Sequence, residues 1–146
     1  MNPLAIRMIQ RFEGLRTIAY QCPAGKWTIG YGTTKGVKPF QRITSEQAQQ
    51  MLEVEVAKLS KKMYSMLTVT LTQYQEAALL SFLYNVGITA FEISTLRKKL
   101  NAGDFEGAAE EFPRWDKITK GGVKTKVAGL TNRRNEERRV FLGVLK

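Results

Sequence analysis

Three side chains near the N-terminus have the types and spacing to share one reaction. Glu13 carries a carboxyl group, Cys22 follows nine residues later, and Thr28 follows after six more. Hydrolysis of a glycosidic bond needs a proton donor on one side of the sugar and an activated nucleophile on the other. A cleft with Glu13 on one wall would have a proton donor there. Cys22 and Thr28 on the other wall would bind and activate the water. The three residues therefore indicate glycosidic-bond hydrolysis.

The elements around these residues are the ones that such a cleft requires. Apolar residues within Asn2–Phe12 recur at helical spacing, so Glu13 lies at the end of a predicted helix. Two alternating runs, Thr17–Gln21 and Lys26–Tyr31, flank a Pro-Ala-Gly turn at positions 23–25. Alternation interrupted by Pro and Gly is typical of a β-hairpin. We therefore expect a helix end that faces a hairpin.

The remainder of the chain predicts helices. Thr44 and Thr72 each begin a capping box, with glutamine three residues later at Gln47 and Gln75. The first box opens a helix whose apolar face continues for about five turns, and the second opens a helix through Asn85. Further helices are expected over Ser94–Asn101, Asp104–Glu111 and Thr125–Leu142, with an exposed loop at Gly121-Gly122. This pattern predicts an α+β fold.

Length and composition narrow the class of protein. The chain has 146 residues, enough for one domain with a sizeable core. It contains one cysteine and no histidine, so an intramolecular disulfide, histidine acid–base catalysis and most zinc sites are excluded. No apolar run approaches the roughly 20 residues that span a membrane, and the first residues lack the apolar core of a secretory signal. We expect synthesis in the cytoplasm without a signal peptide.

The positive charge is unevenly distributed. The formal net charge is +10, and Lys117–Lys146 contributes nine Lys or Arg against two Glu, or +7. Such a balance favours polyanionic partners: nucleic acid, anionic lipid surfaces, or the acidic peptides and polymers of bacterial walls. The sign of the charge does not choose among them.

Motifs spread over nearly the whole chain resemble one known family. Glu13, Cys22 and Thr28 fit the pattern E-x8-(D/C)-x5-T of the phage-type lysozymes, glycoside hydrolase family 24. Four further motifs of that family follow in the same order: W-T-I-G-Y-G at Trp27–Gly32, S-F-x-x-N-V-G at Ser81–Gly87, F-x-R-W at Phe112–Trp115 and G-L-x-x-R-R-x-x-E at Gly129–Glu137. Any one motif is weak evidence, whereas the ordered set is strong.

The resemblance implies a lysozyme-like fold in one domain over residues 1–146. It implies a β-hairpin lobe over about 14–44, a connecting helix over about 45–66 and a helical lobe over about 67–146 that includes the N-terminal helix 2–13. It also assigns the catalytic roles. Glu13 is the general acid, and Thr28 holds the hydrolytic water together with Cys22.

Cys22 stands where many family members carry aspartate, and it matches a subset with cysteine. A thiolate could position or deprotonate water, or it could attack the anomeric carbon directly. Family members with aspartate are understood as inverting enzymes, and the stereochemical outcome with cysteine stays open.

The resemblance also suggests substrate-binding residues. Gly32 and Thr34 are expected to line the sugar groove, and either Arg133 or Arg134 to pair with Glu13 or contact the wall peptide. Thr33 occupies a position where the family often has histidine. Tyr84 and Trp115 are either core residues or sugar platforms, and we expect core.

The implied function is an endolysin that hydrolyses the β-1,4 bond between N-acetylmuramic acid and N-acetylglucosamine in peptidoglycan. No cofactor or metal is implied. We expect a monomer whose partner is the glycan strand, without stable membrane insertion and without nucleic acid. It would act in the periplasm or cell wall after release by a separate membrane-permeabilising protein, a holin.

Three other functions remain as alternatives. A lytic transglycosylase would cut the same bond with the acid alone. A basic nucleic-acid-binding protein would use the charged C-terminal stretch, although no recognised binding motif is present. An inactive wall-binding relative would keep the cleft without turnover.

Overall fold

The computed structural model describes residues 1–143, and Lys146, counted above in the basic stretch, lies outside them. The N-terminal helix α1 (Pro3–Glu13) begins at Asn2, whose side chain accepts a hydrogen bond from the Ala5 amide at 3.1 Å. It ends at Gly14, whose φ of 73° is a backbone conformation that favours glycine. The predicted helix is confirmed, and its last residue is Glu13.

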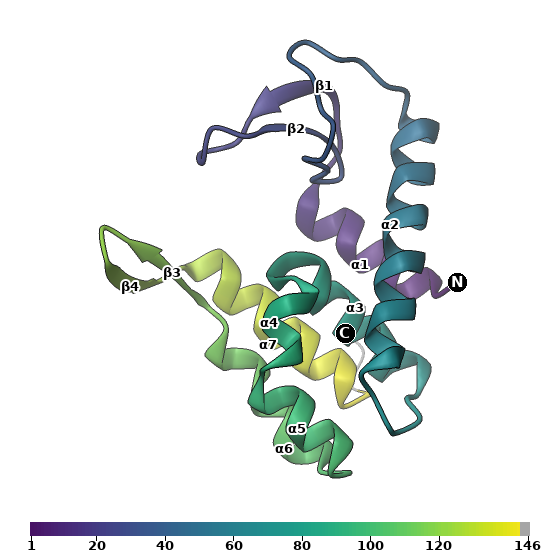
Figure 1. Cartoon of the computed structure of the whole chain (residues 1–146), viewed down its shortest axis with the longest axis vertical. Coiled ribbons are helices and arrows are strands. Elements are labelled where there is room, and N and C mark those ends of the chain that lie inside the picture. Colours follow the sequence, from purple (N-terminus) through teal and green to yellow (C-terminus); the bar gives the residue numbers. More distant parts are fainter. Residues whose placement is uncertain (144–146) are drawn as a thin grey trace.

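A β-hairpin follows directly. Strands β1 (Arg16–Gln21) and β2 (Trp27–Gly30) are antiparallel, with Tyr20 opposite Thr28 and Gln21 opposite Trp27. The Gly25 amide donates to the Cys22 carbonyl at 2.8 Å and closes the turn. This hairpin, also predicted from the alternation, forms the upper part of the molecule in Figure 1.

Two long helices begin where the capping boxes predicted. Helix α2 (Ser45–Ser65) and helix α3 (Gln73–Val86) both show the reciprocal capping bonds of threonine and glutamine. Helix α2 runs from the hairpin lobe down to the helical lobe (Figure 1). Helix α3 packs against α1, α2 and α7, and its residues from Ala77 to Leu83 are all buried.

The rest of the helical lobe consists of shorter elements. These are α4 (Ile88–Glu92), α5 (Thr95–Asn101), α6 (Phe105–Ala109), the 3₁₀ helix η1 (Phe112–Arg114), strands β3 (Lys117–Lys120) and β4 (Val123–Lys126), and α7 (Ala128–Phe141). None of the helices within residues 1–143 is both long and apolar enough to cross a membrane.

The C-terminal third corrects the sequence-based predictions in three places. Gly121-Gly122 is the turn of a hairpin rather than an open loop, and Thr125 pairs with Ile118 in that hairpin. The final helix therefore begins at Ala128, after the Val127 amide has bonded to the Asp116 carbonyl at 2.9 Å. The helix expected over Asp104–Glu111 stops earlier, because α6 ends at Ala109 and Pro113 lies inside the following 3₁₀ helix η1. Helix α4 was not predicted.

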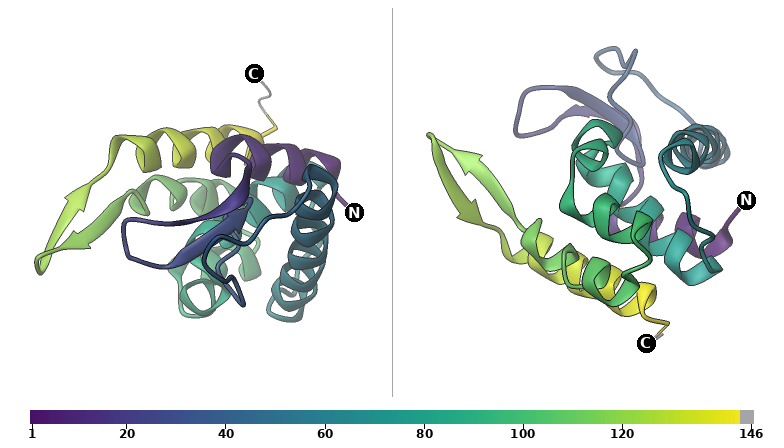
Figure 2. Two further views of the ribbon diagram at one scale, coloured as in Figure 1. Left: turned by 90° about the horizontal axis from the view of Figure 1, so that it is seen from above. Right: turned by 60° about the horizontal axis from the view of Figure 1, so that its bottom comes forward.

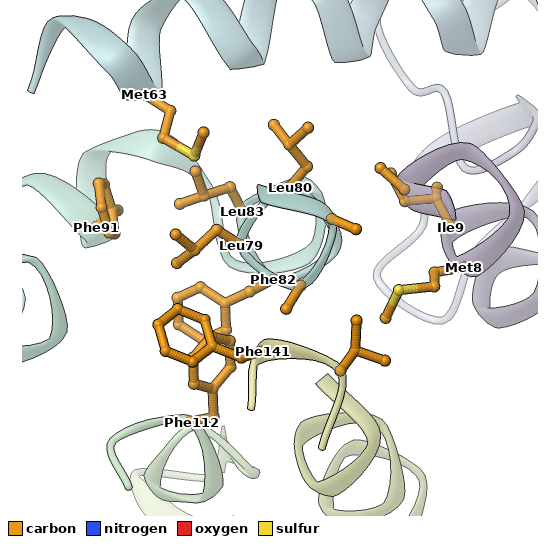
Figure 3. Packing of buried hydrophobic residues seen from close by; sticks show 14 of the residues in the cluster. Met8, Ile9, Met63, Leu79, Leu80, Phe82, Leu83, Phe91, Phe112 and Phe141 are labelled. Carbon is orange, nitrogen blue, oxygen red and sulfur yellow. The ribbon is translucent and has the colours of Figure 1, made fainter. Parts of the chain in front are cut away.

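One apolar core holds the helices together around α3 (Figure 3). Phe82 packs edge-on against Phe112 with ring centroids 5.3 Å apart, and Phe112 lies 5.4 Å from Phe141 of α7. Met8 and Ile9 approach from α1, and Met63 approaches from α2. Because α1 belongs to this core, the position of Glu13 at its end is fixed by packing.

Candidate active site

Glu13 lies where the helical core meets the hairpin lobe. Its Oε2 accepts a hydrogen bond from Nη1 of Arg133 at 2.8 Å. Its other oxygen, Oε1, faces Gly32, and a Cβ on residue 32 would approach it to 2.8 Å. Gly32 also has a φ of 85°, so both the backbone and the space require glycine there. With 21% of its side chain exposed, Glu13 has one oxygen held by the protein and one directed toward the cleft wall.

Arg133 is held in place by α3 and α7 as well as by Glu13. Its Nε donates to Oε2 of Glu137 at 3.1 Å, and its Nη2 donates to the carbonyl of Ser81 at 2.8 Å. The guanidinium group also lies 4.7 Å from the ring centroid of Phe12, within range of a cation–π contact. Arg133 thus positions the catalytic candidate and is itself fixed on several sides.

Arg134 does not lie in the cleft, which corrects the expectation that it binds substrate. Its side chain is 0% exposed. Nε donates to the Trp115 carbonyl at 2.9 Å, Nη1 donates to Oε1 of Glu137 at 2.5 Å, and Nη2 donates to Asn85. Burial lowers the pKa of Arg134, and the neighbouring Glu137 carboxylate opposes that shift. A buried guanidinium with its donors occupied by protein cannot contact a glycan, so Arg134 is structural.

Cys22 and Thr28 lie together on the hairpin. Cys22 begins the turn and is partly exposed, whereas Thr28 is only 4% exposed and donates from its hydroxyl to the Lys26 carbonyl at 3.1 Å. The backbone N–H of Lys26 lowers the pKa of the Cys22 thiol, and the backbone of Ala24 and the Thr28 hydroxyl add to this effect. Each of these donors stabilises the thiolate, and the Thr28 hydroxyl, which has one proton, leaves the Lys26 carbonyl when it donates to the sulfur. The turn therefore favours the reactive form of cysteine.

A cleft opens beside Gly32. A cavity of about 390 Å³ is bounded above by residues 32–35, on one side by α2 and on the other by Leu83, Tyr84 and Ile88. Gly32 and Thr34 both line it, as the resemblance implied. Thr33, at the position where the family often has histidine, lines it too.

The face of α2 that lines the cleft was missed in the sequence analysis. Glu55, Lys58 and Lys62 all border the cavity. They are spaced by three and four residues, which places them on one face of a helix. That spacing was visible in the sequence, but a charged helix face is usually only solvated. Lys58 and Lys62, with Lys35 opposite, make the cleft wall basic.

Tyr84 packs against the core, as expected, and it also joins the two sides of the cleft. It lines the cavity, and its hydroxyl donates to the carbonyl of Tyr31 at 2.5 Å. Burial and the neighbouring negative charge of Glu13 raise the pKa of Tyr84 to about 12. Trp115 packs edge-on against Phe82 at 5.5 Å, next to the core.

The described part of the chain offers no metal site: within residues 1–143 no three His, Cys, Asp or Glu side chains lie close enough to hold an ion. Glu13, Cys22 and Thr28 remain the candidate catalytic residues. A hairpin lobe, a long connecting helix and a helical lobe, with a carboxyl group where the lobes meet, are the features of the lysozyme-like α+β glycoside hydrolases.

Comparisons with known proteins agree with this class. The family model described as "Phage lysozyme" matches residues 10–137. An endolysin of Acyrthosiphon pisum secondary endosymbiont phage 1 is 45% identical over 134 residues, 92% of each chain. A SAR-endolysin of Escherichia phage Mu is 35% identical over 88% of this chain and 73% of its own length. An endolysin of Bacillus phage B103 is 45% identical, but the chain spans only 54% of its length.

Solved structures give the same result. An endolysin from Escherichia coli O157:H7 phage FAHEc1 has a TM-score of 0.91 and 41% identity, covering 97% of this chain and 92% of its own. The muramidase domain of SpmX from Asticaccaulis excentricus has a TM-score of 0.89 and 35% identity, covering 94% of each chain. The chain belongs to the phage lysozyme family.

Proposed function

We propose that the chain hydrolyses the β-1,4 bond between N-acetylmuramic acid and N-acetylglucosamine of peptidoglycan, with Glu13 as the general acid. The observation that supports this role is the orientation of the Glu13 carboxyl group. Arg133 fixes Oε2, and Oε1 faces Gly32, which lines the cleft. A proton delivered there to the leaving sugar oxygen breaks the C1–O bond with general acid assistance.

In this proposal Cys22 and Thr28 activate the water that attacks the sugar from the side opposite Glu13. The Cys22 thiolate accepts a proton from a water molecule held with the help of the Thr28 hydroxyl, and the water oxygen bonds to C1. The step leaves Glu13 as carboxylate and Cys22 as thiol, and exchange with solvent restores both. Direct attack of sulfur on C1 is the alternative use of the same thiolate. It would form a thioglycoside that a second displacement by water then hydrolyses.

The assignment of the chain to the subset with cysteine in place of aspartate belongs to this proposal. So does its organisation as one domain over residues 1–146, with lobes at about 14–44 and 67–146 joined by the helix at about 45–66. Gly32, Thr34 and Arg133 are the substrate-side residues that we retain from the sequence analysis. Gly32 and Thr34 line the cleft, and Arg133 pairs with Glu13, which faces Gly32.

The cellular setting is proposed on the same basis. We place the action of the monomeric protein in the periplasm or cell wall, after synthesis in the cytoplasm and release with the help of a holin. The endolysins and SAR-endolysins among its relatives support wall lysis in general.

The test is digestion of purified peptidoglycan, with the products analysed by mass. Hydrolysis gives muropeptides with a free reducing end. A lytic transglycosylase gives products that are lighter by one water, with an anhydro sugar. Products of the second kind would overturn the proposed reaction. The absence of any product, with binding retained, would indicate a wall-binding relative without turnover.

A further inference from the structure

The hairpin β3–β4 carries lysines on one face. Lys117 pairs with Lys126, and Thr119 pairs with Lys124. Residues directly opposite each other in an antiparallel pair point to the same side. We call the side formed by Lys117, Thr119, Lys124 and Lys126 the basic face. The opposite side holds Ile118 with Thr125 and Lys120 with Val123.

This hairpin does not contribute to the core. All eight residues of its two strands are exposed. It projects from the end of α7, on the same side of the molecule as the hairpin β1–β2, in all three views (Figures 1 and 2). A two-stranded ribbon that buries no face is only marginally stable alone. The hairpin therefore contributes little to the stability of the fold, and its lysines are better explained by binding to another molecule.

The charges on the basic face are only partly balanced. Asp116, at the base of the hairpin, lies 3.2 Å from Lys117 and 3.8 Å from Lys126. The hydrogen bond from Thr131 lowers the pKa of Asp116, with help from the Lys117 ammonium, so its charge is present at neutral pH. Asp116 pairs with two of the three lysines of the basic face, Lys117 and Lys126, and like charges placed directly opposite each other destabilise a hairpin. An anionic ligand would relieve that repulsion.

The basic face lies within reach of the cleft. The hairpin joins α7 at Ala128, and Arg133, the partner of Glu13, lies five residues further along that helix. Five residues of helix rise about 8 Å, and four residues of strand extend about 13 Å. The lysines therefore lie within about 8 Å of helix rise plus about 13 Å of strand from Arg133, the partner of Glu13. A glycan held in the cleft could present its attached peptides to them.

We propose that the basic face binds carboxylates of the peptides attached to the glycan strand being cut, an inference that rests on the proposed function. Lys124 and Lys126 are two residues apart on one strand, about 6.6 Å. Alternate side chains of an extended peptide repeat at the same distance, so two of its carboxylates match two lysines. A peptide attached to a glycan in the cleft is tethered beside the basic face, and this favours a peptide over a separate phosphate polymer.

The test measures binding to purified peptidoglycan in a Glu13→Gln background, so that no cleavage occurs during the assay. The hairpin variant is Lys124→Gln/Lys126→Gln. The matched control is Lys61→Gln/Lys98→Gln, which removes the same charge from exposed positions on α2 and α5. Two exposed ion pairs change an equilibrium constant by about two- to thirtyfold. We expect a loss of affinity in that range for the hairpin variant, none for the control, and a smaller salt dependence for the hairpin variant.

A second arm identifies the ligand. Amidation of the peptide carboxylates with a carbodiimide should lower binding of the parent protein to the level of the hairpin variant. Equal binding of hairpin and control variants would overturn the proposal. Unchanged binding to amidated walls, with loss after phosphate polymers are stripped, would also overturn it and indicate a phosphate ligand. Wild-type cleavage of the same walls is measured separately, so failure of the proposed reaction is distinguished from failure of the hairpin assignment.

Discussion

At the scale of single residues, the position of the Glu13 carboxyl group is set by one contact on each of its two oxygens. Arg133 holds Oε2 at 2.8 Å, and the missing side chain at Gly32 leaves room for Oε1. The sequence motif placed a carboxyl group at a helix end. It could not show which arginine meets that carboxyl group, because Arg133 and Arg134 are adjacent in the sequence and differ only in the direction in which α7 presents them.

Glu13→Gln should reduce peptidoglycan hydrolysis by about 10²–10⁴-fold, because an amide cannot donate the proton that general acid catalysis supplies. The melting temperature should change little in comparison. Glu136→Gln is the matched control, since Glu136 pairs with Arg11 on the surface and away from the cleft. Release of reducing ends from purified walls provides the measurement. The smallest expected loss is about a hundredfold. If Glu13→Gln kept more than about a tenth of the wild-type activity, Glu13 would not be the general acid.

Cys22→Ser should be strongly impaired, whereas Cys22→Asp should keep substantial activity. A serine hydroxyl is almost never ionised at neutral pH, but a carboxylate can accept a proton from water. Alkylation of Cys22 with iodoacetamide should inactivate the wild type, and since the sequence contains one cysteine, any effect maps to that site. Full activity after complete alkylation, verified by mass, would exclude the thiol from the mechanism.

The same residue predicts a pH dependence. The backbone of Lys26, then Ala24 and the Thr28 hydroxyl, lower the pKa of Cys22, so the thiolate persists to a lower pH than in a free cysteine. Activity should therefore fall on the acid side below the ordinary thiol pKa. Thr28→Val removes one thiolate donor and should move this acid limb to higher pH, whereas Thr28→Ser should leave it nearly in place. An identical pH profile in both variants would contradict a working thiolate.

At the scale of elements, α3 and α7 are joined by a buried charge cluster. Glu137 is 0% exposed and accepts hydrogen bonds from Arg133, Arg134 and the hydroxyl of Ser81, the last at 2.6 Å. Its position four residues after Arg133 and three after Arg134 lets one carboxylate meet both guanidinium groups. The cluster thus connects the core to the Glu13 carboxyl group through Arg133.

Glu137→Gln should lower the free energy of unfolding by about 3–5 kcal/mol, because two buried guanidinium groups lose their shared counter-charge. Ser81→Ala removes only one neutral donor to the carboxylate and should lower it by about 1–3 kcal/mol. Chemical denaturation of both variants gives the two values. A loss for Glu137→Gln no larger than that for Ser81→Ala would show that the cluster contributes little to stability.

The elements also show what the sequence could and could not predict. Capping boxes at Thr44 and Thr72 predicted where α2 and α3 begin, because the reciprocal bonds are local. The hairpin β3–β4 was missed although Gly121-Gly122 lies between two alternating runs. Those runs have no continuous apolar face, and without one the alternation gave no reason to prefer strands over a loop extending into the last helix.

Like the secondary structure, the candidate site could be predicted from the sequence only in part. The motif spacing predicted Glu13, Cys22 and Thr28 as catalytic residues, and the structure brings the last two together on one hairpin. The burial of Arg134 was not predictable, since it depends on where Asn85 and Trp115 lie in the folded chain. The cleft-lining face of α2 was visible only as helical spacing of charged residues, a pattern that is common on solvated helices.

At the scale of the whole molecule, a side chain of the helical lobe bonds to the hairpin lobe beside the cleft. Tyr84 extends from α3 and donates its hydroxyl to the Tyr31 carbonyl, one residue before Gly32. The contact therefore determines how far the Gly32 wall stands from the helical side of the cavity. Because Gly32 also faces Oε1 of Glu13, this distance affects both the width of the cleft and the surroundings of the acid.

Tyr84→Phe should therefore raise KM for peptidoglycan several-fold more than it lowers kcat, and lower the free energy of unfolding by about 1 kcal/mol for one lost hydrogen bond. Tyr64→Phe is the matched control: its hydroxyl also bridges two elements, from α2 to Glu76 of α3, but at a position outside the cleft. That variant should lose a similar amount of stability with KM unchanged. Steady-state kinetics on soluble glycan fragments, with thermal unfolding in parallel, separates the two effects. Equal KM values in the two variants would show that the Tyr84 bridge stabilises the fold without setting the width of the cleft.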